Sequence, residues 1–201
     1  KNGLGLFIIT VILTLSCILP ARSYVTPGDG KLYTLDKLTS MTDEISMTSG
    51  DSYLVSSNLI IASEIAPDIL KLDAGTTLAF EKGCYLHVDG ILMASGEFNN
   101  PVVFTSNNSP LKSGNWEGIT FSPSCAGDSC VFEHCEIRYA EVGIRCEKSS
   151  IRISKCKILD SASHAVSFHS SDSTVSKSTL SSSGFSVILC VSSSAKIVDN
   201  E

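Results

Sequence analysis

Apolar positions in the second half of the chain recur about every 22 residues. Five columns carry this pattern: Val131, Ile153, Val175 and Ile197; Ile144, Val166 and Ile188; Cys146, Phe168 and Cys190; Ile137, Ile158 and Leu180; and Cys135, Cys156 and Ser178. The first three columns keep a spacing of 22 residues, and the last two alternate between 21 and 22. Columns that stay in phase over several copies indicate a repeat architecture.

Within each repeat, buried and polar positions alternate over short stretches, as they do at Ile144 and Cys146 and again at Val166 and Phe168. A period of two is that of a β-strand. Strands this short must stack on neighbouring copies and bury a shared core, because they cannot fold alone. Leucine-rich repeats have a similar length, but their Leu-x-x-Leu-x-Leu frame is absent. The pattern therefore predicts an all-β solenoid, a β-helix, over residues 53–201.

Residues 70–121 show the same alternation of apolar and polar positions, with a shorter spacing. Alternating pairs such as Leu78 and Phe80 lie six to eight residues apart, and Gly75, Gly83 and Gly90 mark the turns between them. After Glu201 no capping segment follows the repeat, so we expect further coils in the natural protein.

Residues 24–52 depart from the repeat. Leu35, Leu38, Met41 and Ile45 are spaced by 3, 3 and 4 positions, which predicts a short amphipathic helix. A β-helix leaves an open apolar end, and a helix laid across it protects the strand edges. We therefore predict an N-terminal helical cap here.

Residues 1–23 read as a secretory signal peptide. Lys1 precedes a nearly continuous apolar run from Leu4 to Leu19, and the small residues Ala21 and Ser23 stand where a cleavage site needs them. A transmembrane anchor needs about 20 apolar residues, and this run is shorter. A lipoprotein would instead be modified at Cys17, whose preceding residues fit poorly. We expect a protein that is secreted, extracellular or at the cell surface, with membrane contact only through the cleaved signal peptide.

The composition narrows the classes further. With 43% hydrophobic and 18% charged residues the chain can bury a core, which argues against disorder. A net charge of −6 argues against nucleic acid as a partner, because such binding requires clustered cations.

The cysteines predict one cross-link. Cys125 and Cys130 bracket a four-residue loop, and they could close it as a disulfide in an oxidising compartment. Cys84, Cys135, Cys146, Cys156 and Cys190 are interpreted as small buried hydrophobes. The histidines are scattered and form no zinc-binding spacing, so neither a metal nor a cofactor is expected.

Four segments of the chain resemble a known protein family. The segments Leu70-Lys-Leu-Asp-Ala-Gly-Thr-Thr-Leu-Ala-Phe80, Leu86-His-Val-Asp-Gly-Ile-Leu-Met-Ala-Ser-Gly96, Pro101-Val-Val-Phe-Thr-Ser106 and Trp116-Glu-Gly-Ile-Thr-Phe121 resemble secreted proteins of the pectin-lyase-like superfamily. The resemblance covers roughly residues 53–201 and implies a right-handed parallel β-helix. It does not specify a function, because a single fold hosts many functions.

The densest polar cluster is the candidate site. Glu133, Glu136, Arg138, Tyr139 and Arg145, with His134 and Glu141 beside them, could form a carbohydrate groove on one outer face. The alternative is that they point outward for solubility, because they alternate with buried positions. Glu136 is expected to pair with Lys157, one coil away. Trp116 could be a sugar-stacking platform or could pack a corner of the coil.

No catalytic residues can be named from this pattern. We predict a non-catalytic module that binds carbohydrate, such as polysaccharide or a cell-surface glycan, or that serves as a structural stalk. The alternative is the N-terminal part of a polysaccharide lyase or glycoside hydrolase whose active-site coils lie beyond residue 201.

Overall fold

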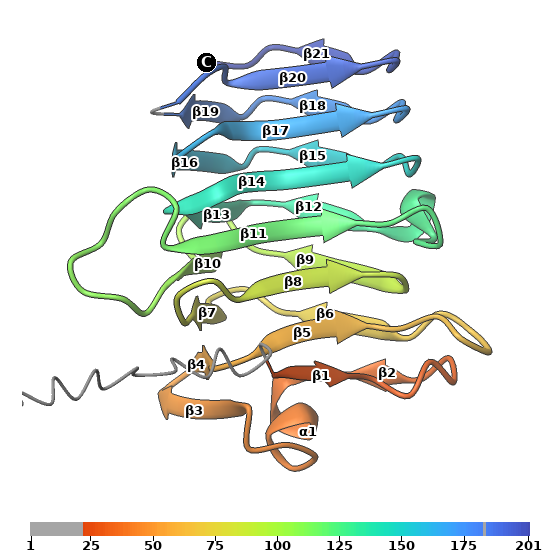
Figure 1. Ribbon diagram of the computed structural model, residues 1–201, viewed down its shortest axis with the longest axis vertical. Helices are drawn as coiled ribbons and strands as arrows, with labels where there is room; N and C mark the ends of the chain where they lie inside the picture. The colour runs from red at the N-terminus through yellow and green to blue at the C-terminus, as the bar shows by residue number, and fades with distance from the viewer. Residues whose placement is uncertain (1–21, 183) are drawn as a thin grey trace, which may run out of the picture.

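The protein is an all-β, right-handed parallel β-helix of about six turns, seen in a computed structural model that describes residues 22–182 and 184–201. The coils stack along one axis from β1 at one end to β21 at the other (Figure 1). Each complete coil contributes one strand to each of three seven-stranded sheets. The predicted solenoid is therefore confirmed.

The three sheets are numbered in the order in which a coil visits them. Sheet I contains β1 (Ser23–Val25), β5 (Asn58–Ile61), β8 (Tyr85–Val88), β11 (Trp116–Phe121), β14 (Ala140–Glu147), β17 (His164–His169) and β20 (Ile188–Val191). Sheet II contains β2 (Leu32–Tyr33), β6 (Ile69–Leu72), β9 (Ile91–Ser95), β12 (Val131–Glu133), β15 (Arg152–Ser154), β18 (Thr174–Ser176) and β21 (Lys196–Val198). Sheet III contains β3 (Ile45–Ser49), β4 (Ser52–Val55), β7 (Thr77–Phe80), β10 (Val102–Ser106), β13 (Cys135–Arg138), β16 (Lys157–Ser161) and β19 (Thr179–Ser182).

The core is built from the repeat columns. Ile144 pairs in register with Val166, which pairs with Ile188, as the 22-residue spacing predicts. One column is corrected, because Phe132 rather than Val131 pairs with Ile153. The coil from Phe132 to Ile153 is 21 residues long. A strict spacing of 22 therefore selects Val131, which is the neighbour of the inward-facing Phe132.

Left-handed residues turn the chain at the corners between sheets. Lys155 and Lys177 have φ values of 54° and 51° between sheets II and III, Tyr139 has 64° between sheets III and I, and Asp160 has 56° near the end of β16 in sheet III. One such residue bends the chain sharply within a single position. From His134 onward these side chains consequently stack from coil to coil at the corners.

The N-terminal end is closed by an antiparallel strand and a helix. β3 pairs antiparallel with β4 and occupies the edge of sheet III. The helix α1 (Leu35–Thr39) packs on β3 and β6 and buries Leu35 and Leu38. Met41 lies beyond the helix and is exposed, so the predicted helix is shorter than its apolar spacing implied. β1 and β2 already belong to sheets I and II, and the helical part of the cap is minor.

At the other end, Cys190 corrects a second expectation. It lies on the inward column with Phe168, but β20 is the last strand of sheet I and Cys190 is exposed. The cysteines at 84, 135, 146 and 156 are buried as predicted. The apolar run and Cys17 lie outside the described residues, as does all of the predicted signal peptide except Arg22 and Ser23. Within the described part, no helix is both long and apolar enough to cross a bilayer.

Candidate functional site

A groove of about 440 Å³ runs along the corner between sheets II and III. It crosses several coils, because its residues come from β13, β16 and β19 and from the turns that precede these strands. We call it the corner groove. It is lined by Glu97, Phe98, Asn99, Pro101, His134, Cys135, Glu136, Lys155, Cys156, Lys157, Lys177 and Thr179.

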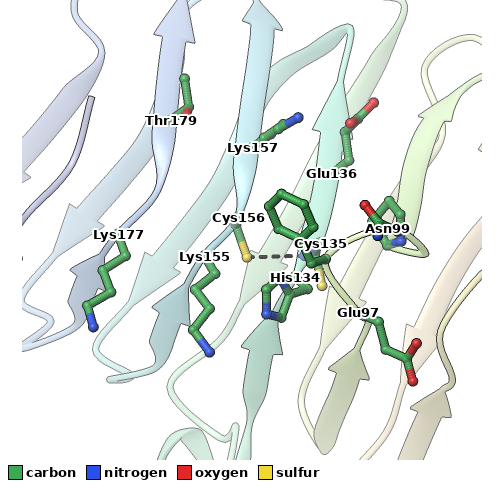
Figure 2. A pocket seen from close by; sticks show the side chains of 12 residues that line it. Glu97, Asn99, His134, Cys135, Glu136, Lys155, Cys156, Lys157, Lys177 and Thr179 are labelled. Carbon is green, nitrogen blue, oxygen red and sulfur yellow. Dashed lines mark hydrogen bonds between the residues drawn. The ribbon is translucent and has the colours of Figure 1, made fainter.

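One wall of the corner groove is a stack of basic side chains. His134, Lys155 and Lys177 are the left-handed corner residues of three successive coils, so each occupies the same place on its own coil. Figure 2 shows the three side chains extending from the same side of the corner. Glu133 Oε1 lies 2.8 Å from Lys155 Nζ, and this hydrogen bond lowers the pKa of Glu133.

The floor consists of thiols that belong to the core. Cys135 and Cys156 are buried, and Cys156 Sγ accepts the backbone N–H of Cys135 at 3.4 Å (Figure 2). Burial raises the pKa of Cys135 well above its ordinary value. A protonated, buried thiol is a poor nucleophile. The floor is therefore structural.

The opposite wall carries Glu136, Lys157 and Thr179 (Figure 2). Glu136 and Lys157 are register partners on β13 and β16, as the repeat predicts. In the described part of the chain, however, Glu136 forms its ion pair with Arg138 of its own strand rather than with Lys157. Arg138 also lies 3.9 Å from Asp160. The expected cross-coil pair is thus replaced by a pair along one strand.

The loop between β9 and β10 closes one end of the groove. It supplies Glu97, Asn99 and Pro101 together with Phe98, whose side chain is 85% exposed. Exposure of a whole aromatic ring next to a polar groove is unfavourable in water unless something packs on it. Phe98 is therefore the aromatic side chain that this groove presents to solvent.

A second hollow of about 600 Å³ lies on the outer face of sheet I. It takes Tyr85 and His87 from β8, Thr120 from β11 and Arg145 from β14, with Asp89 at one edge. We call it the sheet I hollow.

Asp89 is held in place by its neighbours. Its Oδ1 accepts hydrogen bonds from Ser122 and, at 2.9 Å, from Ser124, and it lies 3.2 Å from Nε2 of His87. Burial raises the pKa of Asp89, but the two serines and His87 outweigh burial and lower it overall. An ionised carboxylate of this kind can accept a ligand hydroxyl, but it is not poised as a general acid.

The predicted polar cluster is distributed over all three sheets. Glu133 ends β12 of sheet II, Glu136 and Arg138 lie on β13 of sheet III, and Arg145 lies on β14 of sheet I. Tyr139 turns the corner between sheets III and I. Of these five residues, Glu136 lines the corner groove, as the neighbouring His134 does, and Arg145 lines the sheet I hollow.

Trp116 belongs to the core. Its ring is fully buried and stacks on Phe80 with 4.4 Å between centroids, and its Nε1 donates to the Arg138 carbonyl at 2.8 Å. It is therefore not available as a platform for a sugar. Of the two roles predicted for Trp116, packing at a corner of the coil is the one observed.

The predicted disulfide pair is brought together as thiols. The Sγ atoms of Cys125 and Cys130 lie 3.4 Å apart.

Over residues 22–182 and 184–201, no group of three or more His, Cys, Asp or Glu side chains is arranged to hold a metal ion.

The sequence analysis did not identify Lys155, Lys177 and Phe98 as candidate site residues, although all three line the corner groove. The lysines did carry a signal, because they are 22 residues apart and each directly follows a strand of sheet II. Phe98 stands in the turn-forming segment Gly-Glu-Phe-Asn-Asn-Pro, where an aromatic residue has no core to join.

Comparison with known proteins gives no relative from which to transfer a function. No protein-family model, curated protein or solved structure matches the chain. The functional argument therefore depends on this chain's own residues.

Proposed function

We propose that the protein is a secreted or cell-surface β-helix module that binds carbohydrate without catalysis, and that the corner groove is its binding site. The observation that carries the proposal is the exposed ring of Phe98 at the end of a groove lined by side chains of both charges. Sugar rings present apolar faces that stack on aromatic side chains, and their hydroxyl groups need donors and acceptors around the rim.

The groove supplies both kinds of hydrogen-bonding group. Lys157 and Lys177 are donors, Glu97 is an acceptor, and Asn99 offers both functions. Because these side chains sit on successive coils, they form a line parallel to the solenoid axis. Neighbouring strands are separated by about 4.8 Å, so four coils extend over roughly 14 Å. A line of this length fits a short stretch of a linear saccharide.

The rigidity of the scaffold supports a binding role. Lys155 and Lys177 are corner residues whose neighbours are fixed by the sheets on both sides, as the register of β15 with β18 illustrates, and Lys157 lies on β16. A binding site on a rigid element loses little backbone entropy when a ligand arrives. The secretory signal expected at residues 1–23 supports placement of the module outside the cell, where glycans are abundant.

A binding experiment with matched controls tests the proposal. The protein is applied to a glycan array, and hits are measured by titration calorimetry with wild type, Phe98→Ala and Lys177→Ala. Phe185→Ala and Lys148→Ala are the controls. Phe185 is 91% exposed away from the groove, and Lys148 has φ 52° at another corner. We expect at least a tenfold loss of affinity in the two groove variants and no change in the controls.

Three outcomes would overturn the proposal in distinguishable ways. If Tyr85→Ala or Arg145→Ala abolishes binding while Phe98→Ala does not, the site is the sheet I hollow. If no glycan binds, the binding role is wrong and a structural stalk is favoured. If the bound polysaccharide is cleaved, with unsaturated products or new reducing ends, the protein is an enzyme.

A further inference from the structure

Two thiols at the corner between sheets I and II are positioned for a covalent link. Cys125 and Cys130 flank the short helix η1 (Gly127–Ser129), and their Sγ atoms lie 3.4 Å apart. Cys130 is fully buried and Cys125 is 9% exposed. The loop is anchored at both ends, because Cys125 N donates to the Ser122 carbonyl and Cys130 N donates to that of Gly127. The two sulfurs are thus held together by the backbone around them.

We infer that Cys125 and Cys130 form an intramolecular disulfide that locks the loop between β11 and β12. The inference goes beyond carbohydrate binding and does not depend on it. A disulfide needs about 2.05 Å between the sulfurs, so the thiols must approach by a little over 1 Å. A change of this size can be made by side-chain rotation and a small movement of a surface loop.

The thiols of Cys135 and Cys156 also interact with each other, but both are in addition hydrogen-bonded to backbone carbonyl groups. Cys135 Sγ donates to the Ala94 carbonyl at 3.4 Å, and Cys156 Sγ donates to the Ser154 carbonyl at 3.2 Å. They are successive members of a column whose next member is Ser178. A serine at the same position performs the same hydrogen bonding, which explains these cysteines as ladder residues. We expect them to remain thiols.

The reaction can be written with glutathione disulfide as the oxidant. In the open loop either thiol can react first, and the steps are equivalent from Cys125 or from Cys130; for Cys130 they begin with loss of the thiol proton. Its thiolate attacks glutathione disulfide, forms a mixed disulfide and releases one glutathione thiolate. Cys125 then loses its proton and attacks the Cys130 sulfur, which releases the second glutathione. Two thiols have given up two electrons and two protons, and glutathione disulfide has become two glutathione molecules. Because Cys130 is buried, the first step occurs while the loop is open, during folding.

The link has a structural consequence for the neighbouring face. Ser122 and Ser124 precede Cys125 directly, and both donate to Asp89 at the edge of the sheet I hollow. Fixing Cys125 to Cys130 restricts the segment that carries these serines. We therefore expect the oxidised protein to protect the amide hydrogens of residues 122–130 from exchange better than the reduced protein does.

Peptide mapping tests the pairing. The full chain is refolded in a glutathione redox buffer, alkylated with N-ethylmaleimide before and after denaturation, and digested without reductant. We expect a peptide that joins Cys125 to Cys130 and is lighter by two hydrogens, about 2 Da, than the reduced form, with Cys84, Cys135, Cys146 and Cys156 alkylated only after denaturation. Alkylation of both Cys125 and Cys130, or a link from either to Cys146 or another cysteine, would overturn the inference.

Thermal unfolding provides a second measurement that does not require every variant to be equally stable. Reductant should lower the Tm of wild type and of the Cys84→Ser control by a few degrees, because the closed loop is short. The Cys125→Ser/Cys130→Ser protein should show no response to reductant, whatever its own Tm. An equal response in the double variant would contradict the inference. Glycan binding by the reduced protein is measured in parallel, so failure of the disulfide and failure of carbohydrate binding are separate results.

Discussion

Asp68 Oδ2 accepts the backbone N–H of Gly28 at 2.7 Å, across 40 positions of sequence. Its Oδ1 accepts three more backbone N–H groups, from Asp29, Gly30 and Lys31, at 2.9–3.0 Å. Asp68 is fully buried, so one carboxylate ties the turn between β1 and β2 to the coil above it. Burial alone would raise the pKa of Asp68, but the hydrogen bonds from Thr26 and the backbone outweigh burial and lower it.

Replacement of Asp68 should therefore be among the most destabilising single changes at the N-terminal end. Asp68→Ala leaves four backbone donors without this acceptor and should cost about 3 kcal/mol or more of unfolding free energy. Asp68→Asn keeps the shape and should cost less. Urea denaturation measures both, with Asp73→Asn as the control, since Asp73 is exposed and forms a surface ion pair with Lys71. A loss under about 0.5 kcal/mol in Asp68→Ala would refute this role.

The same site predicts a pH dependence. Because the folded-state pKa of Asp68 is depressed, its contribution is fully present above the unfolded-state pKa of about 3.9 and is lost as the pH falls through the lower folded-state value. Wild type should thus lose stability from about pH 5 downward, and Asp68→Asn should lose less over that interval. Parallel curves for the two proteins between pH 5 and pH 2.5 would show that Asp68 does not contribute to acid unfolding.

Gly118 is required by a close approach of two coils. It has φ 104°, and a Cβ placed on it would lie 1.7 Å from the Val142 carbonyl oxygen of the next coil. The register of β11 with β14 shifts at this point, which is a local bulge. Gly118→Ala should therefore cost several kcal/mol, or prevent folding, because backbone must move to remove the clash.

Gly50 is the matched control for Gly118. It also has a positive φ, 54°, but a Cβ there would meet nothing within 4 Å. Gly50→Ala should cost about 1 kcal/mol from backbone strain alone. Thermal denaturation of both variants separates strain from steric clash. Equal losses in the two would show that the contact with Val142 is relieved at no cost.

The solenoid was predictable because the core repeats. Columns such as Ile144, Val166 and Ile188 are set by strand stacking, which forces similar side chains into similar places. The 21-residue step is visible in the columns of Ile137 and Cys135, but it was not applied to the first column, and so Val131 was assigned where Phe132 belongs. The β3–β4 pairing was also missed, because Ile45 was counted as the last position of a helix.

The grooves were less predictable, for a geometric reason. Residues close in sequence, such as Glu133, Glu136 and Arg145, point from three different sheets of a coil. Residues 22 apart, such as Lys155 and Lys177, lie side by side. A site on a solenoid is thus recognised by reading outward-facing positions down a column, and not by local density of charge.

Non-glycine residues with a positive φ at the corners have backbone strain, and replacement by glycine can relieve this strain. Ser170 has φ 52° and is exposed, at the corner between sheets I and II. Ser170→Gly should be neutral or stabilising by up to about 1 kcal/mol, and Ser170→Val should be destabilising by about 1–2 kcal/mol, because a β-branched residue is strongly disfavoured there. Chemical denaturation measures both. The same pair of changes at the exposed position Asp172, where φ is not positive, should give the opposite sign for glycine.

At the corner between sheets II and III, side-chain oxygens in one column accept hydrogen bonds from backbone N–H groups of the preceding coil. Ser178 Oγ accepts the N–H of Cys156 at 3.0 Å, and Asn200 Oδ1 accepts the N–H of Ser178 at 2.9 Å. Ser178→Ala should cost about 1–3 kcal/mol, because it leaves the Cys156 N–H buried without an acceptor.

The column itself suggests the rescue for that loss. Asn200 stands one coil beyond Ser178, and its Nδ2 donates to the Val175 carbonyl at 2.9 Å while its Oδ1 serves the ladder. Ser178→Asn should therefore retain more stability than Ser178→Ala, although asparagine is larger. If both variants lose the same free energy in urea denaturation, volume and not hydrogen bonding decides this position. If Ser178→Asn is the more stable of the two, the ladder is interchangeable among cysteine, serine and asparagine, as the successive coils at 156, 178 and 200 already display.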